Sequence, residues 1–383
     1  MQADASRERV LFLYLPTGGG HLAPARALAG RIAAEYGADT RIECPVKSRV
    51  GLFCYEDGYR IASQKLPALW RFMYANNVTP AAMRLSQFIT AVFSLRAMTR
   101  LLDEYRPTRV VCVHHMLAWS LRQALRGRRR IPTIMVVTDP YDPHPIWAFN
   151  HRWPLACYTE EAAKVLVGYG ADPRRVYSHS LIVNERFERP VSPSEIADYR
   201  RSLGLREGKP MVLIAGGADG MKRASQMTRE LLSSRLAFDL VVVCGRDAML
   251  KLEVETVALA HRIKAIDKKK VVVLGFTDSM PMLMRSADAI ASKAGASVVA
   301  EVLCVGKPNI IAYRIPGQEE GNVDFVVKHG VGLYCRTPRM LKRGVESILG
   351  DAGRRESIER NIREMGFRNG LYGIAETIMT VAP

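Results

Sequence analysis

Residues 292–322 read SKAGASVVAEVLCVGKPNIIAYRIPGQEEGN and contain a turn, a helix, a strand and a polar loop in succession. A glycine turn leads into a predicted helix from about Ala296 to Cys304, and a strand is predicted at Asn309–Tyr313. The first backbone N–H groups of a helix lack partners inside it and lie at the positive end of its dipole. The turn therefore predicts a binding site for an anion such as a diphosphate.

The residues at this turn have the sizes that such a site needs. Gly295, Ala296 and Ser297 are small, so phosphate groups can approach the backbone closely. Glu301 lies one helical turn beyond Ser297, within reach of a ribose bound over the same end of the helix. An ordinary βα unit with a tight turn would have the same pattern, but the polar loop IPGQEEGN after the next strand favours a ligand site.

The chain of 383 residues exceeds one typical domain, and its hydrophobic content of 48% is enough for two buried cores. Its seven cysteines have no C-x-x-C spacing, which favours a reducing compartment over disulfides or a zinc site. The N-terminus MQADASRERV lacks the features of a signal peptide, and no apolar run is long enough to span a bilayer. We expect a cytoplasmic protein, soluble or peripherally associated with the cytoplasmic face of the membrane.

The net charge of +17 implies an anionic partner: nucleic acid, an acidic membrane surface or a phosphorylated ligand. Nucleic acid is disfavoured because the sequence has no recognisable reading motif or aromatic platform. Residues 50–100 are rich in aromatic and basic side chains, and no acidic residue lies between Asp57 and Asp103. Basic amphipathic helices of this kind bind anionic membranes. Core helices with solvated arginine faces would look similar, but the lack of acidic residues favours the membrane.

A second strand, turn and helix lie near the N-terminus. Arg9–Leu15 is a predicted buried strand, TGGGH follows at residues 17–21, and a helix is predicted from about Leu22 to Tyr36. The glycines match neither the dinucleotide fingerprint nor a P-loop, so no nicotinamide or flavin cofactor is expected. His21 lies where ligands bind in open α/β sheets, and a helix N-terminus disfavours imidazolium. His21 is therefore a candidate proton acceptor; the alternative is a polar residue that caps the helix.

Strands and helices alternate along both halves of the chain, the pattern of an α/β protein with parallel sheets. Polar clusters follow predicted strands at TDPYDPHPIW (138–147), GGADG (216–220) and GFTDSM (275–280). Residues 184–196, with two prolines, are the predicted linker, and one final helix is predicted at 338–365. Two Rossmann-like halves joined in this way predict a nucleotide or sugar-nucleotide enzyme with its ligand in a cleft between the domains.

The predicted domains are residues 1–190 and 191–366, with a tail at 367–383 that packs back on the N-terminal domain. After the first strand, the remaining strands are expected at Arg109–Val113, Ile131–Val137, Leu155–Thr159, Val176–Val183, Met211–Ala215, Leu240–Cys244, Val271–Leu274, Ala289–Ala291, Asn309–Tyr313 and Val331–Tyr334.

Seven motifs occur in an order that resembles one family: TGGGH, VVTDPYDPHPIW, GGADGM, CGRDAML, VLGFTDSM, KAGASVVAEVL and IPGQEEGN. They are similar to the GT-B glycosyltransferases that include monogalactosyldiacylglycerol synthases and processive diacylglycerol glucosyltransferases, relatives of the peptidoglycan lipid-linked N-acetylglucosaminyltransferase. The resemblance covers about residues 9–366. It implies two Rossmann-like domains with parallel sheets facing a central cleft. By the same resemblance, the N-terminal domain is expected to bind the acceptor and the membrane, and the C-terminal domain a UDP-sugar.

The resemblance also implies roles for individual residues. His21, assisted by Asp139, is the expected general base, and Gly19, Gly20 and His144 are expected to contact substrate in the N-terminal domain. The residues expected to bind the UDP-sugar are Gly216, Gly217, Phe276, Gly295, Ala296, Ser297, Val298, Glu301, Gln318, Glu319 and Asn322.

The expected reaction is the inverting transfer of a hexose from a UDP-sugar to a membrane lipid hydroxyl, with diacylglycerol as the expected acceptor and no cofactor. The sequence has no Asp-x-Asp motif, so no essential metal is expected. Ser297 and Val298 stand where the family usually has Gly-Thr, and Pro24 is more like the peptidoglycan enzyme. Two alternatives stay open: transfer of N-acetylglucosamine to a polyprenyl-diphosphate-linked acceptor, and epimerisation of a soluble UDP-sugar.

Overall fold

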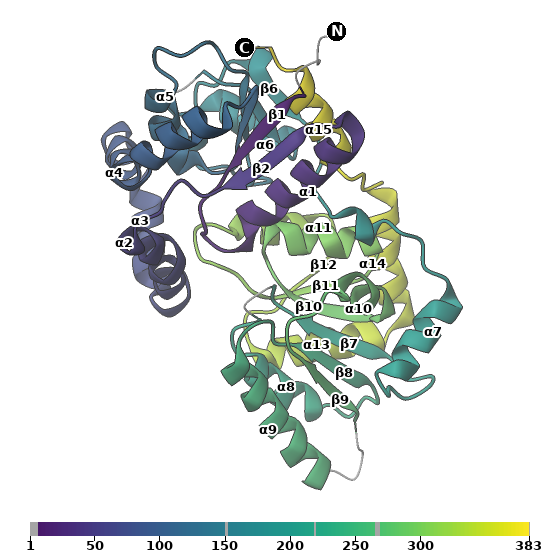
Figure 1. Ribbon diagram of the computed structural model, residues 1–383. Coiled ribbons are helices and arrows are strands. Elements are labelled where there is room, and N and C mark those ends of the chain that lie inside the picture. The colour runs from purple at the N-terminus through teal and green to yellow at the C-terminus, as the bar shows by residue number, and fades with distance from the viewer. Residues whose placement is uncertain (1–6, 150–151, 218–219, 265–268, 383) are drawn as a thin grey trace. The chain divides into compact units, whose positions relative to one another are not determined.

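The computed structural model describes residues 7–149, 152–217, 220–264 and 269–382. The chain forms two compact units. The first consists of Met1–Asn184, Ile315–Gly321 and Arg368–Pro383, and the second of Glu185–Arg314 and Asn322–Phe367. Each unit contains a six-stranded parallel sheet with helices packed around it (Figure 1). The predicted α/β fold, with a Rossmann-like sheet in each half, is confirmed.

The sheet of the first unit has the strand order β2-β1-β3-β4-β5-β6. Its central strands are continuous apolar runs because helices cover both of their faces. In β1 and β3 the register pairs Leu13 with Cys112, so these two strands end side by side. The strands are β1 (Arg9–Leu13), β2 (Asp39–Glu43), β3 (Arg109–Cys112), β4 (Thr133–Val136), β5 (Leu155–Cys157) and β6 (Val176–Ser178).

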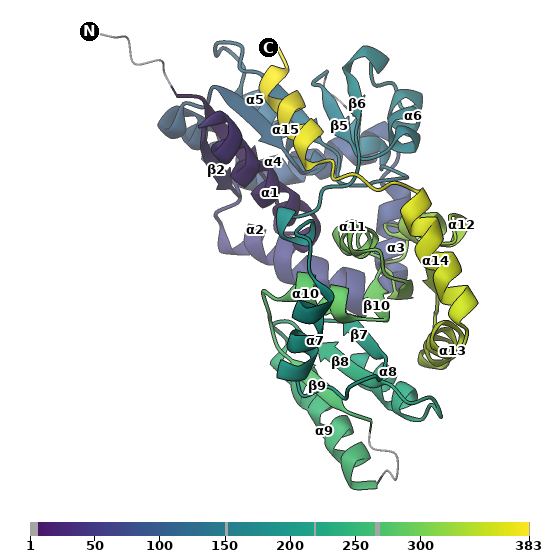
Figure 2. The ribbon, with the colours of Figure 1, turned by 90° about the vertical axis from the view of Figure 1, so that its right-hand side faces the viewer.

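The helices of the first unit include the C-terminal helix α15, which lies alongside α1 in both views (Figures 1 and 2). Leu371, Ile374 and Ile378 of α15 are buried, and the guanidinium of Arg31 in α1 lies 4.7 Å from the centre of the Tyr372 ring. The helices are α1 (Gly19–Tyr36), α2 (Arg49–Phe53), α3 (Pro67–Asn76), α4 (Pro80–Tyr105), α5 (Ala118–Ala124), α6 (Glu160–Gly168) and α15 (Leu371–Thr380).

The sheet of the second unit has the order β12-β11-β10-β7-β8-β9. The strands are β7 (Met211–Ala215), β8 (Asp239–Val243), β9 (Val271–Leu274), β10 (Ala289–Lys293), β11 (Asn309–Tyr313) and β12 (Gly332–Tyr334). The helices are α7 (Pro193–Ser202), α8 (Ala224–Leu232), α9 (Ala248–Lys264), α10 (Met280–Ser286), α11 (Ala296–Val305), α12 (Glu320–Lys328), α13 (Pro338–Leu349) and α14 (Ala352–Glu364).

Several helices begin or end at residues other than those predicted from the sequence. The single final helix predicted at 338–365 is wrong, because α13 ends at Leu349 and the Asp351 side chain accepts the Arg354 N–H (3.0 Å) to cap a new helix, α14. The helix predicted from Leu22 begins at Gly19, which places His21 in its first turn. The predicted linker at 184–196 already contains the first four residues of α7, which begins at Pro193.

In the part of the chain that the structure describes, no helix is both long and apolar enough to cross a bilayer.

The burial of α15 leads to a stability prediction. Replacing the fully buried Ile374 by Ala is expected to lower the free energy of unfolding by about 2–5 kcal/mol, because it leaves a cavity against α1. The exposed Glu376 lies on the same helix, and Glu376→Ala should change that energy by less than about 0.5 kcal/mol. Denaturant unfolding measures both, and equal effects would contradict the packing described here.

Candidate active site

The strand order of the first unit identifies the edge at which its ligand site is expected. The chain moves to one side of β1 to form β2 and to the other side to form β3 and the later strands. In open α/β sheets, ligands bind beyond the carboxyl ends of the two strands at such a switch point. The residues in that position are Thr17–His21 after β1 and Val113–His115 after β3. The glycine turn that the sequence singled out therefore lies at the switch point.

His21 is buried and held in one tautomer. Its Nδ1 lies 2.7 Å from the carbonyl oxygen of Val113, which can only accept a hydrogen bond, so Nδ1 carries the proton. The hydroxyl of Thr138 lies 3.0 Å from the same nitrogen. Burial lowers the pKa of His21 to about 4, against the opposing effect of the Val113 hydrogen bond. The imidazole is therefore neutral at physiological pH, and its Nε2 has a lone pair that can accept a proton.

Two further histidines lie beside His21, and the sequence analysis missed both. The rings of His21 and His114 are 4.3 Å apart, and His114 stacks on His115 at 4.7 Å. The Met116 N–H donates to Nδ1 of His114, so Nε2 of His114 donates to the Thr17 hydroxyl at 3.0 Å. Burial, followed by the neighbouring imidazoles, lowers the pKa of His114 and of His115. The signal was present in the sequence, because both residues directly follow a predicted buried strand.

Asp139 and His144 lie in the segment after β4. The Trp147 Nε1–H donates to the carboxylate of Asp139 at 2.7 Å. Burial raises the pKa of Asp139 to about 6, although this bond and one from the backbone N–H of His144 lower it. The neighbouring Thr138, and not Asp139, makes the contact with His21 among the described residues. His144 is buried, and its Nε2 donates to the carbonyl of Tyr74 at 3.4 Å.

The polar loop after β11 is divided between the two units. Gln318 and Glu319 belong to the first unit, where Glu319 accepts a hydrogen bond from the backbone N–H of Ile315 at 2.7 Å. Asn322 belongs to the second unit and donates to the carbonyl of Ala294 at 2.7 Å, beside the turn before α11. The loop that the sequence presents as one motif thus contributes to each unit separately.

The second unit has its own switch point, between β7 and β10. Gly216 and Gly217 follow β7, and Gly295 follows the neighbouring strand β10. A Cβ on Gly216 would lie 2.4 Å from the carbonyl oxygen of Gly220, and Gly217 has a φ of 87°, so both positions require glycine. At Gly216 the chain itself fills the space of a Cβ, whereas nothing lies within 4 Å of a Cβ placed on the exposed Gly217, where a ligand can approach the backbone. Ala218 and Asp219 of the same motif lie outside the described residues.

The N-terminus of α11 fits the predicted anion site. The first N–H with an acceptor inside the helix is that of Val299, which bonds to the carbonyl of Gly295 at 3.0 Å. No side chain caps the helix, so the N–H groups of Ala296, Ser297 and Val298 precede the internal hydrogen-bond ladder. These residues are only half-buried. An uncapped helix start of this kind is the geometry in which anions bind, and phosphate binding here stays a prediction.

Two side chains flank this anion site in the sequence. Glu301 is half-buried and has no hydrogen-bond or ion-pair partner in the described part of the chain; burial raises its pKa to about 8. It is therefore mostly protonated near neutral pH and can both donate to and accept from a diol. Phe276, after β9, is exposed, and the guanidinium of Arg246 lies 4.8 Å from its ring centre. Across residues 7–149, 152–217, 220–264 and 269–382, no group of three or more His, Cys, Asp or Glu side chains is arranged to hold a metal ion.

The tautomer of His21 can be tested directly by NMR. Nitrogen-15 spectra should show a neutral His21 with its proton on Nδ1 down to pH 5, because a group with a pKa of about 4 is then about nine-tenths unprotonated. The spectrum of His21→Gln identifies the signal. A His21 that titrates near 6.5, or that carries its proton on Nε2, would contradict the geometry.

Comparisons with known proteins identify the family of the chain. Residues 21–183 match the family model of monogalactosyldiacylglycerol (MGDG) synthase, and residues 211–376 match the glycosyltransferase family 28 C-terminal domain. The chloroplastic monogalactosyldiacylglycerol synthase of Spinacia oleracea is 31% identical over 363 residues, which cover 90% of this chain and 67% of that protein. The chain thus spans about two thirds of the length of this relative.

Solved structures show the same fold at low sequence identity. Acinetobacter baumannii MurG has a TM-score of 0.63 and 16% identity, covering 97% of this chain and 99% of that one. Anabaena Alr3699/HepE in complex with UDP-glucose has a TM-score of 0.59 and 14% identity, covering 97% and 98%. The fold is that of the GT-B glycosyltransferases. The sequence matches show that the chain belongs to the monogalactosyldiacylglycerol synthase family and is an enzyme.

Proposed function

We propose that the protein transfers a hexose from a UDP-sugar to the hydroxyl of diacylglycerol, with inversion at the anomeric carbon. The observation that carries the proposal is the neutral, buried His21, whose free Nε2 lies at the switch point of the first unit. Membership of the monogalactosyldiacylglycerol synthase family supports the acceptor and the class of reaction. The hexose itself is left open, because glucose and galactose differ in the orientation of one hydroxyl.

The second unit supplies the groups that a UDP-sugar needs. The free N–H groups at the start of α11 would bind the diphosphate, and the exposed backbone at Gly217 would allow it to approach. Glu301 would bind the ribose, since a protonated carboxyl both donates to and accepts from two adjacent hydroxyls. Val298 offers no hydroxyl to the phosphates, so their binding would depend on backbone groups and on Ser297.

The chemistry would be a single in-line displacement. The acceptor oxygen forms its bond to the anomeric carbon as the bond from that carbon to the UDP oxygen breaks, and Nε2 of His21 takes the acceptor proton. Negative charge grows on UDP and is stabilised by the N-terminus of α11, which is already oriented before the reaction. At physiological pH the ionised form of Asp139 would favour the resulting imidazolium through its charge. We infer that no metal is required, so that chelation by EDTA should leave the rate unchanged.

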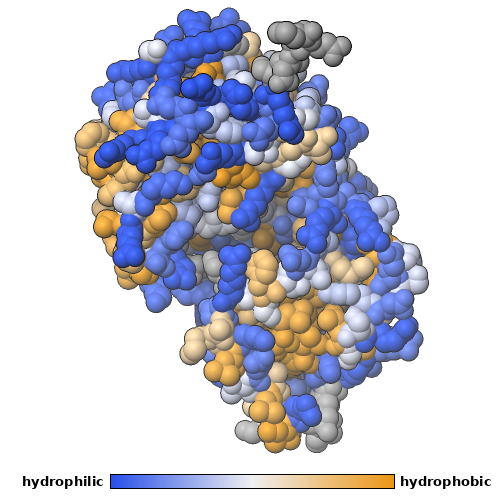
Figure 3. All heavy atoms as spheres, viewed as in Figure 1, coloured by the Kyte–Doolittle hydropathy of each residue, from blue (hydrophilic) through white to orange (hydrophobic). Residues whose placement is uncertain are grey.

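A lipid acceptor lies in a membrane, so the enzyme needs a surface that binds the membrane. Helices α3 and α4 provide such a surface. No residue of α3 is buried, which argues against a core helix. Apolar side chains gather over α2, α3 and α4, with hydrophilic ones between them (Figure 3). We define the interfacial surface as the exposed apolar side chains of α3 and α4 and of the residue before α3: Leu66, Leu69, Phe72, Met73, Leu85, Phe88, Ile89 and Val92.

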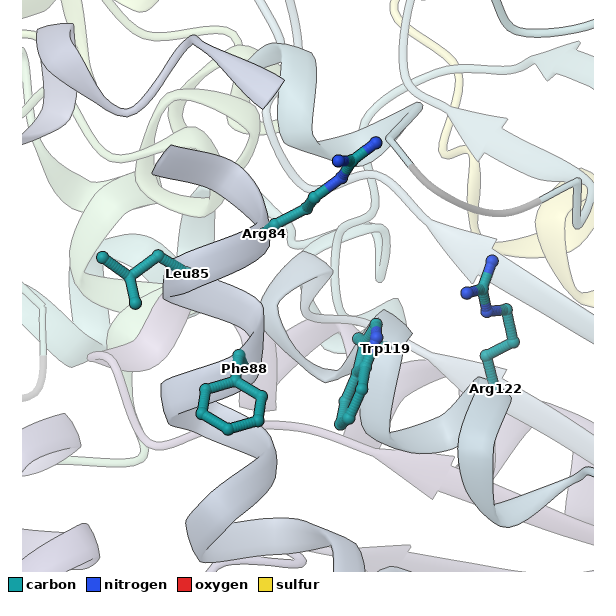
Figure 4. Close-up of a pocket in the computed structure, with 5 residues that line it drawn as sticks. All are labelled: Arg84, Leu85, Phe88, Trp119 and Arg122. Carbon is teal, nitrogen blue, oxygen red and sulfur yellow. The ribbon is translucent and has the colours of Figure 1, made fainter. Parts of the chain in front are cut away.

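An open hollow of about 560 Å³ adjoins this surface between α4 and α5. The rings of Phe88 and Trp119 meet edge to face at 5.9 Å, and the guanidinium groups of Arg84 and Arg122 lie to one side of them (Figure 4). The two aromatic rings suit the binding of an acyl chain, and the two guanidinium groups beside them suit an anionic headgroup. The hollow supports the proposal that the enzyme works on an anionic membrane.

The reaction is tested with vesicles that contain diacylglycerol and an anionic lipid, incubated with labelled UDP-sugars and then extracted. Label is expected in the lipid phase, and His21→Ala should lower kcat by about 100- to 10,000-fold with an unchanged fold by circular dichroism. Near-normal transfer by His21→Ala would show that His21 is not the base. Label transferred only to a polyprenyl diphosphate acceptor, or epimerised without lipid, would replace the proposed function.

Vesicle binding tests the interfacial surface separately. Phe72→Ser with Met73→Ser removes two side chains that are 66% and 52% exposed, and should reduce sedimentation with anionic vesicles, because inserted apolar area is lost. The matched control is Leu252→Ser with Ile263→Ser on α9, where the side chains are 57% and 74% exposed. Equal losses for the two pairs would contradict a surface confined to α3 and α4.

A further inference from the structure

The loop Ile315–Gly321 is held by the first unit at several points. Its own Glu319 accepts the N–H of Ile315 at 2.7 Å and closes the loop on itself. A Cβ on Gly317 would lie 3.3 Å from the ring of Tyr74, and one on Gly321 would lie 3.3 Å from the side chain of Tyr141. The loop therefore packs against α3 and against the segment after β4. Its conformation depends on residues distant from it in the sequence.

The side chain of Gln318 in this loop is oriented by one residue, Tyr59. The Tyr59 hydroxyl donates to Oε1 of Gln318 at 3.1 Å. In this arrangement Oε1 is the end of the carboxamide that accepts the bond from Tyr59. Nε2 of Gln318 is then the end left to donate, and no protein acceptor for it is found in the described part of the chain. Gln318 thus presents two N–H donors in a fixed direction.

Tyr59 is itself held rigidly between other parts of the first unit. It lies between two π-helical turns, Cys54–Gly58 and Ile61–Lys65, and such turns are frequent at functional sites. Its ring meets that of Trp70 in α3 edge to face at 5.1 Å. A Cβ on Gly18, in the turn before His21, would lie 3.8 Å from the Tyr59 ring. The Tyr59 side chain therefore lies next to the glycine turn, α3 and the polar loop.

We propose that Tyr59 is a positioning residue that fixes the Gln318 carboxamide so that its N–H groups bind the hexose of the donor. The inference rests on the proposed function, and on the role in binding the UDP-sugar that the family resemblance implies for Gln318. Tyr59 touches no substrate and acts through Gln318. Tyr59 lies in the segment directly before Leu66 and α3, which belong to the interfacial surface.

Tyr59→Phe removes the hydroxyl and keeps the ring packed on Trp70. It is expected to lower kcat/KM for the UDP-sugar by about 3- to 10-fold, the usual effect of one neutral hydrogen bond. The affinity for UDP alone should not change, because UDP lacks the hexose. Tyr55→Phe is the matched control: the Tyr55 hydroxyl bonds to Thr90 at 2.6 Å in the same region without contact to the loop, and its loss should leave donor kinetics unchanged.

A double-mutant cycle distinguishes positioning from a general structural effect. If Tyr59 acts through Gln318, Tyr59→Phe combined with Gln318→Ala should lose no more kcat/KM than Gln318→Ala alone. Losses that multiply, or weaker UDP binding by Tyr59→Phe, would overturn the inference.

Hydrogen exchange without substrate separates this inference from the proposed function. The backbone N–H groups of Gln318 and Glu319 both bond to the carbonyl of Ile315, at 3.3 and 3.1 Å. Both should exchange about 3- to 10-fold faster in Tyr59→Phe than in the wild type or Tyr55→Phe. Unchanged exchange would overturn the positioning role even in an active enzyme. A wild type that transfers no hexose would instead defeat the proposed function, whatever the exchange shows.

Discussion

The parallel pairing of β1 with β3, and of β7 with β10, determines where the candidate functional groups lie. Parallel strands share a direction, so the residues that follow neighbouring strands emerge at one edge of the sheet. In the first unit this brings the ring of His21 to 4.3 Å from that of His114, although β2, the interfacial helices and β3 separate them in the chain. In the second unit it places the backbone of Gly216 and Gly217 beside the turn that starts α11. Without this pairing neither site would exist.

Both sites contain ionisable groups that are buried without an opposite charge. Burial lowers the pKa of His21 and raises the pKa of Asp139 and of Glu301. His21 opposes folding as the pH falls through its ordinary value near 6.5, and the two acids oppose folding as the pH rises through their ordinary values near 4. These buried groups therefore lower the stability of the folded protein both as the pH falls and as it rises, whereas the same groups exposed to water would not. Such an arrangement is typical of sites selected for binding or proton transfer.

The sequence was sufficient for the fold class because its signals are local. Buried strands that end in glycine turns, and small residues before α11, have the same meaning wherever they occur in an α/β chain. His114 and His115 escaped notice because a histidine pair after a strand becomes informative only once the strand order is known. The placement of the polar loop in the first unit involves the contact of Gln318 with Tyr59, 259 residues earlier, and that of Gly317 with Tyr74, which no local pattern reveals. The break between α13 and α14 was visible at Gly350-Asp351, but helical periodicity on both sides obscured it.

The position of α15 has a consequence for how the protein is made. β1–β6 and the helices between them are synthesised first, yet α1 packs against α15, which is synthesised only after the second unit. The apolar face of α1 that α15 covers therefore stays exposed while the whole second unit is being translated. The second unit can complete its own sheet earlier, since the last segment assigned to it ends at Phe367. Of the two units, the one whose first strand is synthesised first is therefore the one completed second.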